Sequence, residues 1–379
     1  MLIPNRTWFF ASGLAWLWFI NVPGAAAEEY QRYWGDLHGH TVFSDGTGTV
    51  AEYFQYARDV AQLDFVGVTD HDFGHAAPWR MPKAHWQETQ TAADRYTLAG
   101  RFVALAGYEW TSQPKYWRGF TNGASEGLFP GLPRFFNHKN VYFSKPVEYL
   151  FSAKETASMT PDQLARAVEH AGGLVHNNHP TAENDGRDQF DYESRWFSII
   201  ANTEMLPDTM RYNGKTYSLL GEQTVRAFLD RGGRTGFVGG SDTHEGQPAA
   251  RTAVFATELT REAIFDALRH RRNYAVSNAR IELEFTIDGR WMGEEITVSD
   301  QPRVSVSIQG TARLAEVVVI RNGAVWKRET PPGLRFEFRG QDHDFSGQAY
   351  YYVRVTQTDA DAQGNPSRAW SSPIWVKAK

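Results

Sequence analysis

The sequence predicts an α/β domain followed by a small all-β domain, and two observations lead to this fold class. From about residue 30 to 278, short apolar runs rich in β-branched residues alternate with segments whose apolar residues recur at helical spacing. From about residue 280 onward, apolar and polar residues alternate and the helical spacing disappears. The first pattern is typical of a parallel sheet or a barrel, and the second of an antiparallel sandwich.

The first region contains five apolar runs that we predict to be buried strands, at residues 63–71, 101–110, 172–180, 196–204 and 234–244. Three helices are predicted between them, at residues 49–62, 160–172 and 259–272. Thr49, Thr160 and Thr260 stand where each helix begins, and a threonine hydroxyl there can accept a hydrogen bond from a free backbone N–H. We expect this α/β domain to cover residues 28–278.

The second region, residues 279–379, is predicted to be a small β-sandwich. Its alternating segments are residues 281–289, 303–310, 315–329, 334–340, 349–357 and 372–378. Asn322-Gly323 lies inside the third segment and predicts a two-residue hairpin turn, because both residue types accept the positive φ that such a turn needs.

The first 27 residues have the pattern of an export signal. Arg6 supplies a positive charge, residues 8–22 form an apolar stretch, and residues 25–27 are alanines suited to cleavage. A membrane anchor is disfavoured because the stretch is shorter than the roughly 20 residues that cross a bilayer. We therefore expect a signal peptide over residues 1–27, and a periplasmic or secreted protein without a membrane span.

Charge and composition exclude several classes of function. The formal net charge is −5 and no run of lysine and arginine occurs, which argues against nucleic acid or an anionic membrane as the main partner. The sequence has no cysteine, so it has no cysteine nucleophile and no disulfide framework. It also lacks the Gly-x-Ser-x-Gly elbow of serine esterases.

Histidine and carboxylate side chains gather where the predicted strands begin or end. His38 and His40 are two residues apart, as are Asp242 and His244, so each pair can project to one side of a strand. The other members of this pattern are Asp45, Asp70, His71, Glu109, His138, His176 and His179. Strand ends converge on one face of a β/α barrel, so these segments can deliver metal ligands to one site. Imidazole and carboxylate without thiolate suit Zn, Mn or Fe.

The motifs that carry these residues resemble, as a set, the PHP (polymerase and histidinol phosphatase) superfamily of metal-dependent hydrolases. The motifs are DLHGHTVFSDG, VTDHD, GYEW, NHKNVYF, HNNHP and GGSDTH, and the resemblance covers about residues 33–278. The chain looks most like the exported branch related to carbaryl hydrolase, which often carries a C-terminal β-sandwich. The resemblance implies a distorted (β/α)7 barrel that holds two or three divalent ions of Zn, Mn or Fe.

Transferred residue by residue, the resemblance implies a set of metal ligands: His38, His40, Asp45, His71, Glu109, His138, His179, Asp242 and His244. Glu109 would bridge two ions, whose shared water would become hydroxide near neutral pH. The catalytic residues would then be Glu109, His179 and Asp242, with Asp242 also accepting a proton. His176 precedes His179 by three residues and faces the opposite side if both lie on a strand; if the strand has ended, both can reach the site.

Further residues are expected around the ligands. Asp36 and Asp70 either orient ligand imidazoles or cap backbone amides. Lys139, Arg187 and Arg195 are candidates to contact an anionic substrate group. The leading function is hydrolysis of small-molecule phosphoesters by a metal-bridged hydroxide. The alternatives are a carboxyl or carbamate aryl-ester hydrolase on the same metal centre, and a non-catalytic protein that binds glycans or surfaces.

Overall fold

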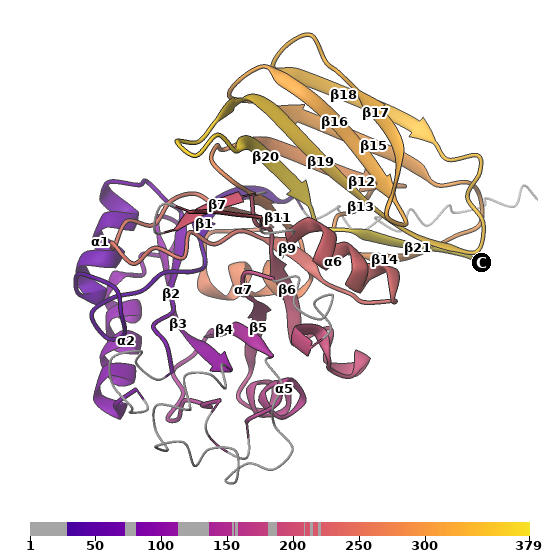
Figure 1. Cartoon of the computed structure of the whole chain (residues 1–379). Coiled ribbons are helices and arrows are strands. Elements are labelled where there is room, and N and C mark those ends of the chain that lie inside the picture. Colours follow the sequence, from indigo (N-terminus) through magenta and orange to yellow (C-terminus); the bar gives the residue numbers. More distant parts are fainter. Residues whose placement is uncertain are drawn as a thin grey trace, which may run out of the picture.

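The structure is a computed structural model that describes residues 29–379 apart from 73–80, 113–135, 154, 156–157, 181–187, 208, 213–214 and 219–220. The expected signal peptide lies outside the described residues. Within the described ranges, no helix is both long and apolar enough to cross a membrane. The chain forms an α/β unit, residues 31–276, and a β unit, residues 282–379, which lie one above the other in Figure 1.

The α/β unit is built on strands that follow one another in the order β11-β10-β1-β2-β3-β4-β5-β6-β9. In chain order their bounds are β1 Gln31–Asp36, β2 Phe65–Val68, β3 Val103–Ser112, β4 Asn137–Phe143, β5 Gly173–Asn177, β6 Ile200–Glu204, β9 Gly236–Val238, β10 Thr252–Ala256 and β11 Asn273–Val276. A separate hairpin is formed by β7 Thr209–Tyr212 and β8 Lys215–Ser218.

The directions of these strands differ from the prediction of a parallel arrangement. Four neighbouring pairs are parallel: β1/β2, β2/β3, β5/β6 and β6/β9. Four are antiparallel: β1/β10, β10/β11, β3/β4 and β4/β5. A helix lies in sequence between β4 and β5, and another between β10 and β11, yet both strand pairs are antiparallel. Alternation of strand and helix in a sequence therefore does not fix strand direction.

Five α-helices are described in the α/β unit: α1 Val50–Asp59, α2 Lys83–Tyr96, α5 Pro161–His170, α6 Gly221–Asp230 and α7 Arg261–Arg269. Two short 3-10 helices, η3 Asp188–Phe190 and η4 Ser194–Trp196, precede β6. The three predicted helices are confirmed as α1, α5 and α7, and each begins after its expected threonine cap. Helices α2 and α6 were not predicted. The N-cap residue of α2 is Pro82, which has no side chain that can accept a hydrogen bond.

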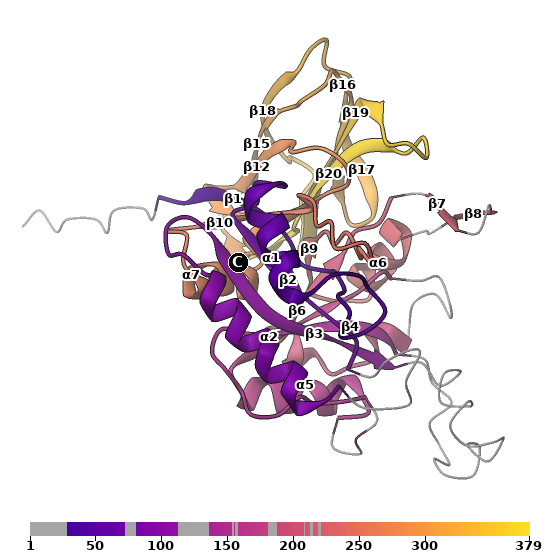
Figure 2. The same cartoon turned by 90° about the vertical axis from the view of Figure 1, so that its left-hand side faces the viewer.

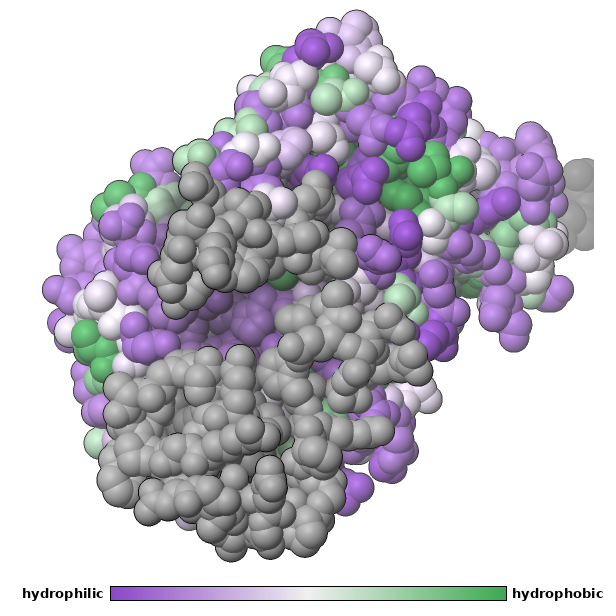
Figure 3. Space-filling view, in the orientation of Figure 1, coloured by the Kyte–Doolittle hydropathy of each residue, from purple (hydrophilic) through white to green (hydrophobic). Residues whose placement is uncertain are grey.

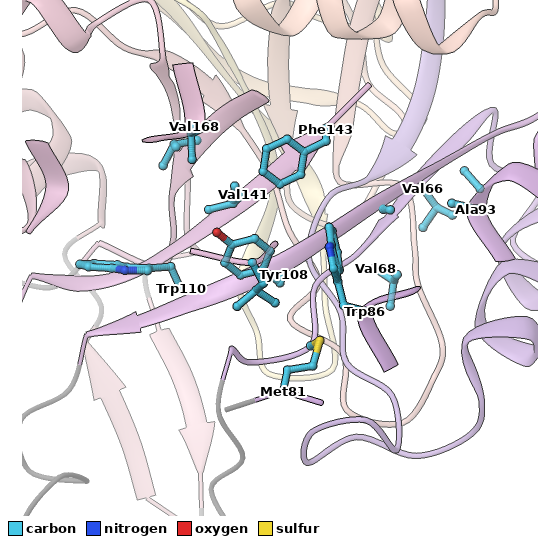
Figure 4. Packing of buried hydrophobic residues seen from close by; sticks show 14 of the residues in the cluster. Val66, Val68, Met81, Trp86, Ala93, Tyr108, Trp110, Val141, Phe143 and Val168 are labelled. Atoms are coloured by element: carbon cyan, nitrogen blue, oxygen red, sulfur yellow. The ribbon is translucent and has the colours of Figure 1, made fainter. Parts of the chain in front are cut away.

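Apolar side chains fill the space between the helices and the outer face of the strands in the α/β unit. Helices α1 and α2 pack on β2 and β3, and both lie in front of these strands in Figure 2. Trp86 of α2 meets the ring of Tyr108 of β3 edge-on at a centroid distance of 5.7 Å, and Phe143 of β4 lies 6.1 Å from Trp86 (Figure 4). This layer fixes the outer face of β3 and β4.

The opposite face of the same strands looks into the interior. Along β3, Val103 and Leu105 contribute to an inner core that also receives Ile264 and Leu268 from α7. Because side chains alternate along a strand, Glu109 lies on the same face as Val103 and Leu105. The apolar inner core therefore ends in a buried carboxylate at the carboxyl end of β3.

The strands of the β unit belong to two sheets. One has the order β13-β12-β15-β18. The other contains β14-β21-β19-β20, with β16 paired to β19 and β17 paired to β16. The bounds are β12 Glu282–Ile287, β13 Arg290–Trp291, β14 Glu295–Val298, β15 Arg303–Gln309, β16 Leu314–Arg321, β17 Ala324–Glu329, β18 Arg335–Gln341, β19 Gln348–Ala360, β20 Pro366–Ser371 and β21 Ile374–Ala378. Figure 3 shows the molecule from the same side as Figure 1, and the described residues on that side form a largely hydrophilic surface. This surface is consistent with apolar side chains packed inside both units.

The predicted hairpin between β16 and β17 is confirmed. Arg321 pairs with Ala324 across the turn, and Asn322 and Gly323 have φ values of 48° and 73°. Strands β13, β14 and β20 were not predicted. Strand β20 also pairs with β11 of the α/β unit, so hydrogen-bonded strands run continuously from one unit into the other.

Candidate metal centre

Two distant motifs come together at one end of the α/β unit. The segment after β1 and the segment after β9 form a parallel bridge between Gly39 and Thr243, where His40 N donates to Thr243 O at 2.8 Å. A Cβ on Gly39 would lie 2.3 Å from the hydroxyl oxygen of Tyr53, so this position needs glycine. The bridge places His40 Nε2 3.1 Å from Asp242 Oδ1. The His-x-His and Asp-x-His motifs are therefore neighbours.

Glu109 stands at the centre of the assembled residues and is 1% exposed. Its two oxygens face different imidazoles. Around Oε1 lie His138 Nδ1 at 3.0 Å, His179 Nε2 at 3.2 Å and His38 Nε2 at 3.3 Å. Around Oε2 lie His71 Nδ1 at 2.8 Å and His40 Nε2 at 3.7 Å. Five imidazoles thus surround one carboxylate.

A second carboxylate, Asp45, gathers the outer imidazoles. Its Oδ1 lies 3.4 Å from His244 Nε2, 3.6 Å from His71 Nε2 and 3.7 Å from His40 Nδ1. The side chains of Asp242 and His244 are 44% and 38% exposed, whereas those of His38 and His40 have no exposure. The cluster is therefore buried on one side and open to solvent on the other.

Grouped by distance, these side chains form four sets whose ligand atoms lie within 4.8 Å of one another. The sets are His40-Asp45-His71-His244, His38-Glu109-His179, His38-His40-Asp242 and His71-Glu109-His138. Together they contain every residue in the ligand set that the motifs suggested. His138 lies inside β4, a strand that is not among the five predicted runs.

The close packing of acids and imidazoles shifts their protonation equilibria. Burial favours a raised pKa for Glu109, but the imidazoles of His138, His71 and His38 hold that pKa well below its usual range. Burial lowers the pKa of His138 to about 4, even though Glu109 opposes the shift. His138 is therefore neutral at pH 7 and offers a nitrogen lone pair, as a metal ligand must.

The residues fit a divalent metal ion. The ring nitrogens His38 Nε2 and His138 Nε2 are buried and have no hydrogen-bond partner among the described residues. Buried polar atoms are rarely left without a partner, so an orphaned nitrogen beside a carboxylate indicates a missing electrophile. The cluster offers only nitrogen and oxygen donors, which suits Zn, Mn or Fe.

His71 is oriented by residues behind it. Its Nδ1 lies 2.7 Å from the hydroxyl of Thr111, whose backbone N–H donates to Asp72 Oδ1 at 2.9 Å. Asp72 also accepts hydrogen bonds from Ser152 Oγ and Ala153 N, each at 2.7 Å. Burial raises the pKa of Asp72 to about 6. Asp72 was not among the predicted site residues, although it is the last residue of the VTDHD motif.

Asp36 and Asp70 accept hydrogen bonds from backbone N–H groups, and Asp70 also accepts them from hydroxyls. Capping of backbone amides is the second of the two roles predicted for them. Asp36 accepts backbone N–H groups of Ser241 at 3.0 Å and Ala249 at 2.9 Å. Asp70 accepts hydrogen bonds from Thr41 N, Thr41 Oγ1 and Ser44 Oγ, all at 2.7 Å. These bonds fix the segments after β1 and β9 that carry the ligands.

The structure separates His176 from His179. His179 lies beside Glu109, whereas His176 Nε2 contacts Asn202 Nδ2 at 3.2 Å and its ring faces Tyr142 at 5.0 Å. Burial lowers the pKa of His176 to about 3, so it is a neutral interior side chain. Of these two histidines, only His179 belongs to the cluster.

Of the three cationic residues considered as substrate contacts, Lys139 has its charged group away from the cluster. Lys139 is fully buried, and its Nζ donates to Asn177 Oδ1 at 2.7 Å and to the backbone oxygen of Gln189 at 2.9 Å. It alternates with His138 along β4 and so faces away from the cluster. The expectation of a substrate contact is wrong for Lys139. Arg195 is exposed and paired with Glu193, and Arg187 lies outside the described residues.

Two further polar residues belong to the cluster and were missed. Asn178 Nδ2 donates to Glu109 Oε1 at 2.8 Å. Glu204 is 2% exposed, and its Oε1 lies 2.8 Å from His38 Nδ1. Glu204 is the last residue of the predicted strand 196–204, so the strand-end pattern that selected the other residues also contained the signal for it.

Three residues at the cluster have a left-handed backbone. The φ angles of Asn137, His179 and Asp242 are 59°, 22° and 51°. Residues other than glycine pay a conformational cost there, and such strain is concentrated at functional sites. The backbone at His179 and Asp242 is thus held in place by its surroundings.

The fold and the cluster define a mixed α/β protein with a set of side chains able to hold divalent metal ions. A family described as protein of unknown function (DUF3604) matches residues 49–119 and 208–312. An uncharacterized protein of Chlamydia trachomatis is 26% identical over 374 residues, covering 90% of this chain and 57% of that protein. A protein of Chlamydia muridarum, also uncharacterized, is 25% identical with the same coverage. The chain thus spans little more than half the length of these relatives.

Two solved structures show limited similarity. A two-domain protein from Bacteroides vulgatus, described as containing a predicted PHP-like metal-dependent phosphoesterase, has a TM-score of 0.45 and 15% identity, covering 89% of this chain and 94% of that chain. The fibronectin(III)-like modules of Clostridium thermocellum CbhA have a TM-score of 0.18 and 16% identity, covering 25% of this chain and 94% of that chain.

Proposed function

We propose that this protein is a metal-dependent hydrolase of ester bonds and that phosphoesters are its substrate class. The observation that carries the proposal is Glu109, a buried carboxylate with imidazole nitrogens on both oxygens. A carboxylate in this position can bridge two ions. The resemblance of the six motifs to the PHP superfamily supports the choice of phosphoesters over other esters.

The residues have distinct parts in the proposal. His38, His40 and Asp242 would hold one ion. Glu109 belongs to two further sets, one with His38 and His179 and one with His71 and His138, so it could contribute to a second ion. His71, Asp45 and His244 provide a third set of donors at the open side. When bound, the ions would lower the pKa of water and polarise the ester group.

Asp242 is the residue best placed to handle a proton. It is the most exposed of the carboxylates in the cluster, at 44% of its side chain, and it contacts His40 Nε2 at 3.1 Å. A general base must lie within hydrogen-bond reach of the proton that it accepts, and the exposed carboxylate of Asp242 can be reached by water. Its backbone is left-handed, with a φ of 51°, and the surrounding structure must hold it there.

Hydrolysis of a chromogenic panel tests the proposal. The mature protein, loaded separately with Zn²⁺ and Mn²⁺, is offered phosphate mono-, di- and triesters, and carboxylate and carbamate aryl esters. The double variant His38→Ala, His40→Ala removes two donors. The control is His270→Ala, which changes an exposed histidine, 56% exposed, at the end of α7.

We expect turnover of a phosphoester that is lost in the double variant and kept in the control. Turnover of carboxyl or carbamate esters alone would overturn the substrate class and keep the metal-dependent hydrolase. Turnover that is equal in the wild type and the double variant would contradict the metal centre. Silence of a protein that binds no metal would favour the non-catalytic binding protein.

A further inference from the structure

Glu204 makes two contacts with the cluster, one through each carboxylate oxygen. Oε1 lies 2.8 Å from His38 Nδ1, and Oε2 accepts the backbone N–H of His179 at 2.8 Å. His38 and His179 belong to one set of donors with Glu109, and His38 also belongs to the set with His40 and Asp242. One buried side chain therefore connects two of the sets.

The contact between Glu204 and His38 affects which ring nitrogen of His38 has a free lone pair. A carboxylate at Nδ1 accepts the proton of that nitrogen, which leaves the Nε2 lone pair available. His38 Nε2 is buried, lacks a hydrogen-bond partner among the described residues and points to the carboxylates of Glu109 and Asp242 at 3.3 and 3.2 Å. Glu204 thus selects the tautomer of His38 in which Nε2 can bind an ion.

The contact with His179 fixes a strained segment. His179 has a φ of 22°, and its backbone N–H donates a hydrogen bond to Glu204. A hydrogen bond to a carboxylate is stronger than one between neutral groups, so it can hold the backbone in this costly conformation. The imidazole of His179 then stays within 3.2 Å of Glu109.

Gly240 provides the space that Glu204 occupies. A Cβ on Gly240 would lie 2.3 Å from Glu204 Oε1 and 2.6 Å from the Cβ of His38. The φ of Gly240 is not positive, so the backbone itself accepts an alanine there and only these contacts exclude it. The second glycine of the GGSDTH motif is therefore required by Glu204 and His38.

We propose that Glu204 is a positioning residue that orients His38 and His179 together, so that metal binding by the two sets depends on one carboxylate. The inference rests on the proposed metal centre and extends it to a residue outside the ligand set. Glutamine has one acceptor oxygen, so from the positions of the two carboxylate oxygens Glu204→Gln can accept the N–H of His179 or that of His38 Nδ1, but not both. If its amide nitrogen faces His38 Nδ1, that nitrogen must be unprotonated, and Nε2 then carries the proton and cannot bind an ion.

Cobalt titration of metal-free protein tests the inference. Co²⁺ absorption and equilibrium dialysis give the number and affinity of bound ions for the wild type, Glu204→Gln and Gly240→Ala. Loss of a residue that orients a metal ligand costs about 10- to 100-fold in affinity, and we expect this loss in both variants. The matched control is Glu245→Gln, the same chemical change on an exposed residue next to His244.

A double variant separates positioning from a general loss of stability. If Gly240→Ala acts by displacing Glu204, then Glu204→Gln, Gly240→Ala loses no more cobalt affinity than either single variant. Additive losses would overturn the shared mechanism. Thermal melts of the metal-free proteins show whether each variant folds. If Glu204→Gln does not fold, Glu204→Asp, which keeps the charge but is one methylene too short for both contacts, decides the question, because Gly240→Ala also presses on His38.

The outcomes distinguish this inference from the proposed function. Wild-type protein that binds cobalt, with Glu204→Gln and Gly240→Ala binding it equally well, would overturn the role of Glu204 and leave the metal centre intact. Wild-type protein that binds no cobalt would contradict both. Weakened binding in both variants with unchanged binding in Glu245→Gln supports the inference.

Discussion

The two units each bury a carboxylate, and the partners of these carboxylates differ. In the β unit, Asp342 accepts hydrogen bonds from Arg321 Nη1 at 2.6 and 2.8 Å and from the hydroxyl of Tyr351 at 2.6 Å. In the α/β unit, Glu109 faces imidazole nitrogens on both oxygens. Asp342 is satisfied by permanent donors, whereas the partners of Glu109 are themselves able to bind a metal.

The partners of a buried carboxylate therefore distinguish a structural charge from a functional one. Among the described residues of the β unit, Asp342 is the only buried carboxylate, and its neighbours complete its hydrogen bonds. Around Glu109, by contrast, buried ring nitrogens of His38 and His138 lack partners. A polar network that is only partly satisfied is costly, so its retention indicates a ligand that completes it.

The largest expected effect is on the carboxylate of the metal centre. Glu109→Gln keeps the shape of the side chain but removes the charge that faces the imidazoles. We expect metal content to fall and hydrolysis to decrease by at least about 100-fold, because a lost ligand costs no less than a lost orienting residue. Elemental analysis and steady-state kinetics measure both. Full activity in this variant would refute the central place of Glu109.

Metal removal sharpens the comparison between the units. An ion that binds the folded chain at 100 times its dissociation constant stabilises it by about 2.7 kcal/mol. We expect chelation to lower the melting temperature of the wild type, while Glu109→Gln changes little on chelation. Calorimetry with and without chelator measures this. Equal shifts in both proteins would place the stabilising ion elsewhere.

The matching change in the β unit affects stability and leaves metal binding alone. Asp342→Asn leaves Arg321 and Tyr351 without their carboxylate. Because the Arg321 side chain is 29% exposed and can be hydrated, we expect a loss of about 2 kcal/mol, below the usual cost of breaking a fully buried pair. Urea unfolding gives the free energy, and elemental analysis gives the metal content. A reduced metal content would show that the units are not independent.

The smallest effect is expected at the start of α1, behind the metal centre. Thr49 Oγ1 accepts the backbone N–H of Glu52 at 3.2 Å, and Glu52 Oε2 accepts Thr49 N at 2.7 Å. Thr49→Ala removes the hydroxyl acceptor of this capping box and costs about 1 kcal/mol. Thermal unfolding should show the loss with unchanged metal content. A change in metal content would mean that α1 positions the ligands.

The sequence was most informative where local rules decide the structure. Threonine caps at Thr49 and Thr160 predicted helix starts, and Asn322-Gly323 predicted a hairpin, because each depends on neighbouring residues only. Strand direction was not predictable in this way. The antiparallel course of β4 depends on how distant segments pair, which no local pattern states.

For the site, the sequence indicated the chemical types of residue and their strand ends. It could not show that Glu109 would be surrounded by imidazoles, nor which of His176 and His179 would join them. Lys139 was misjudged because a basic residue next to His138 was taken as available to substrate, whereas strand alternation directs it to the opposite face. Glu204 was overlooked because it belongs to none of the six motifs, although it ends a predicted strand as Glu109 nearly does.

The most direct test of the central claim is a crystal structure of the metal-loaded protein with anomalous diffraction measured at the Zn and Mn edges. The account predicts anomalous peaks about 2.0–2.2 Å from imidazole nitrogens and carboxylate oxygens of the cluster, with Glu109 in contact with more than one of them. Peaks elsewhere in a protein that has bound metal, with none beside Glu109, would contradict it.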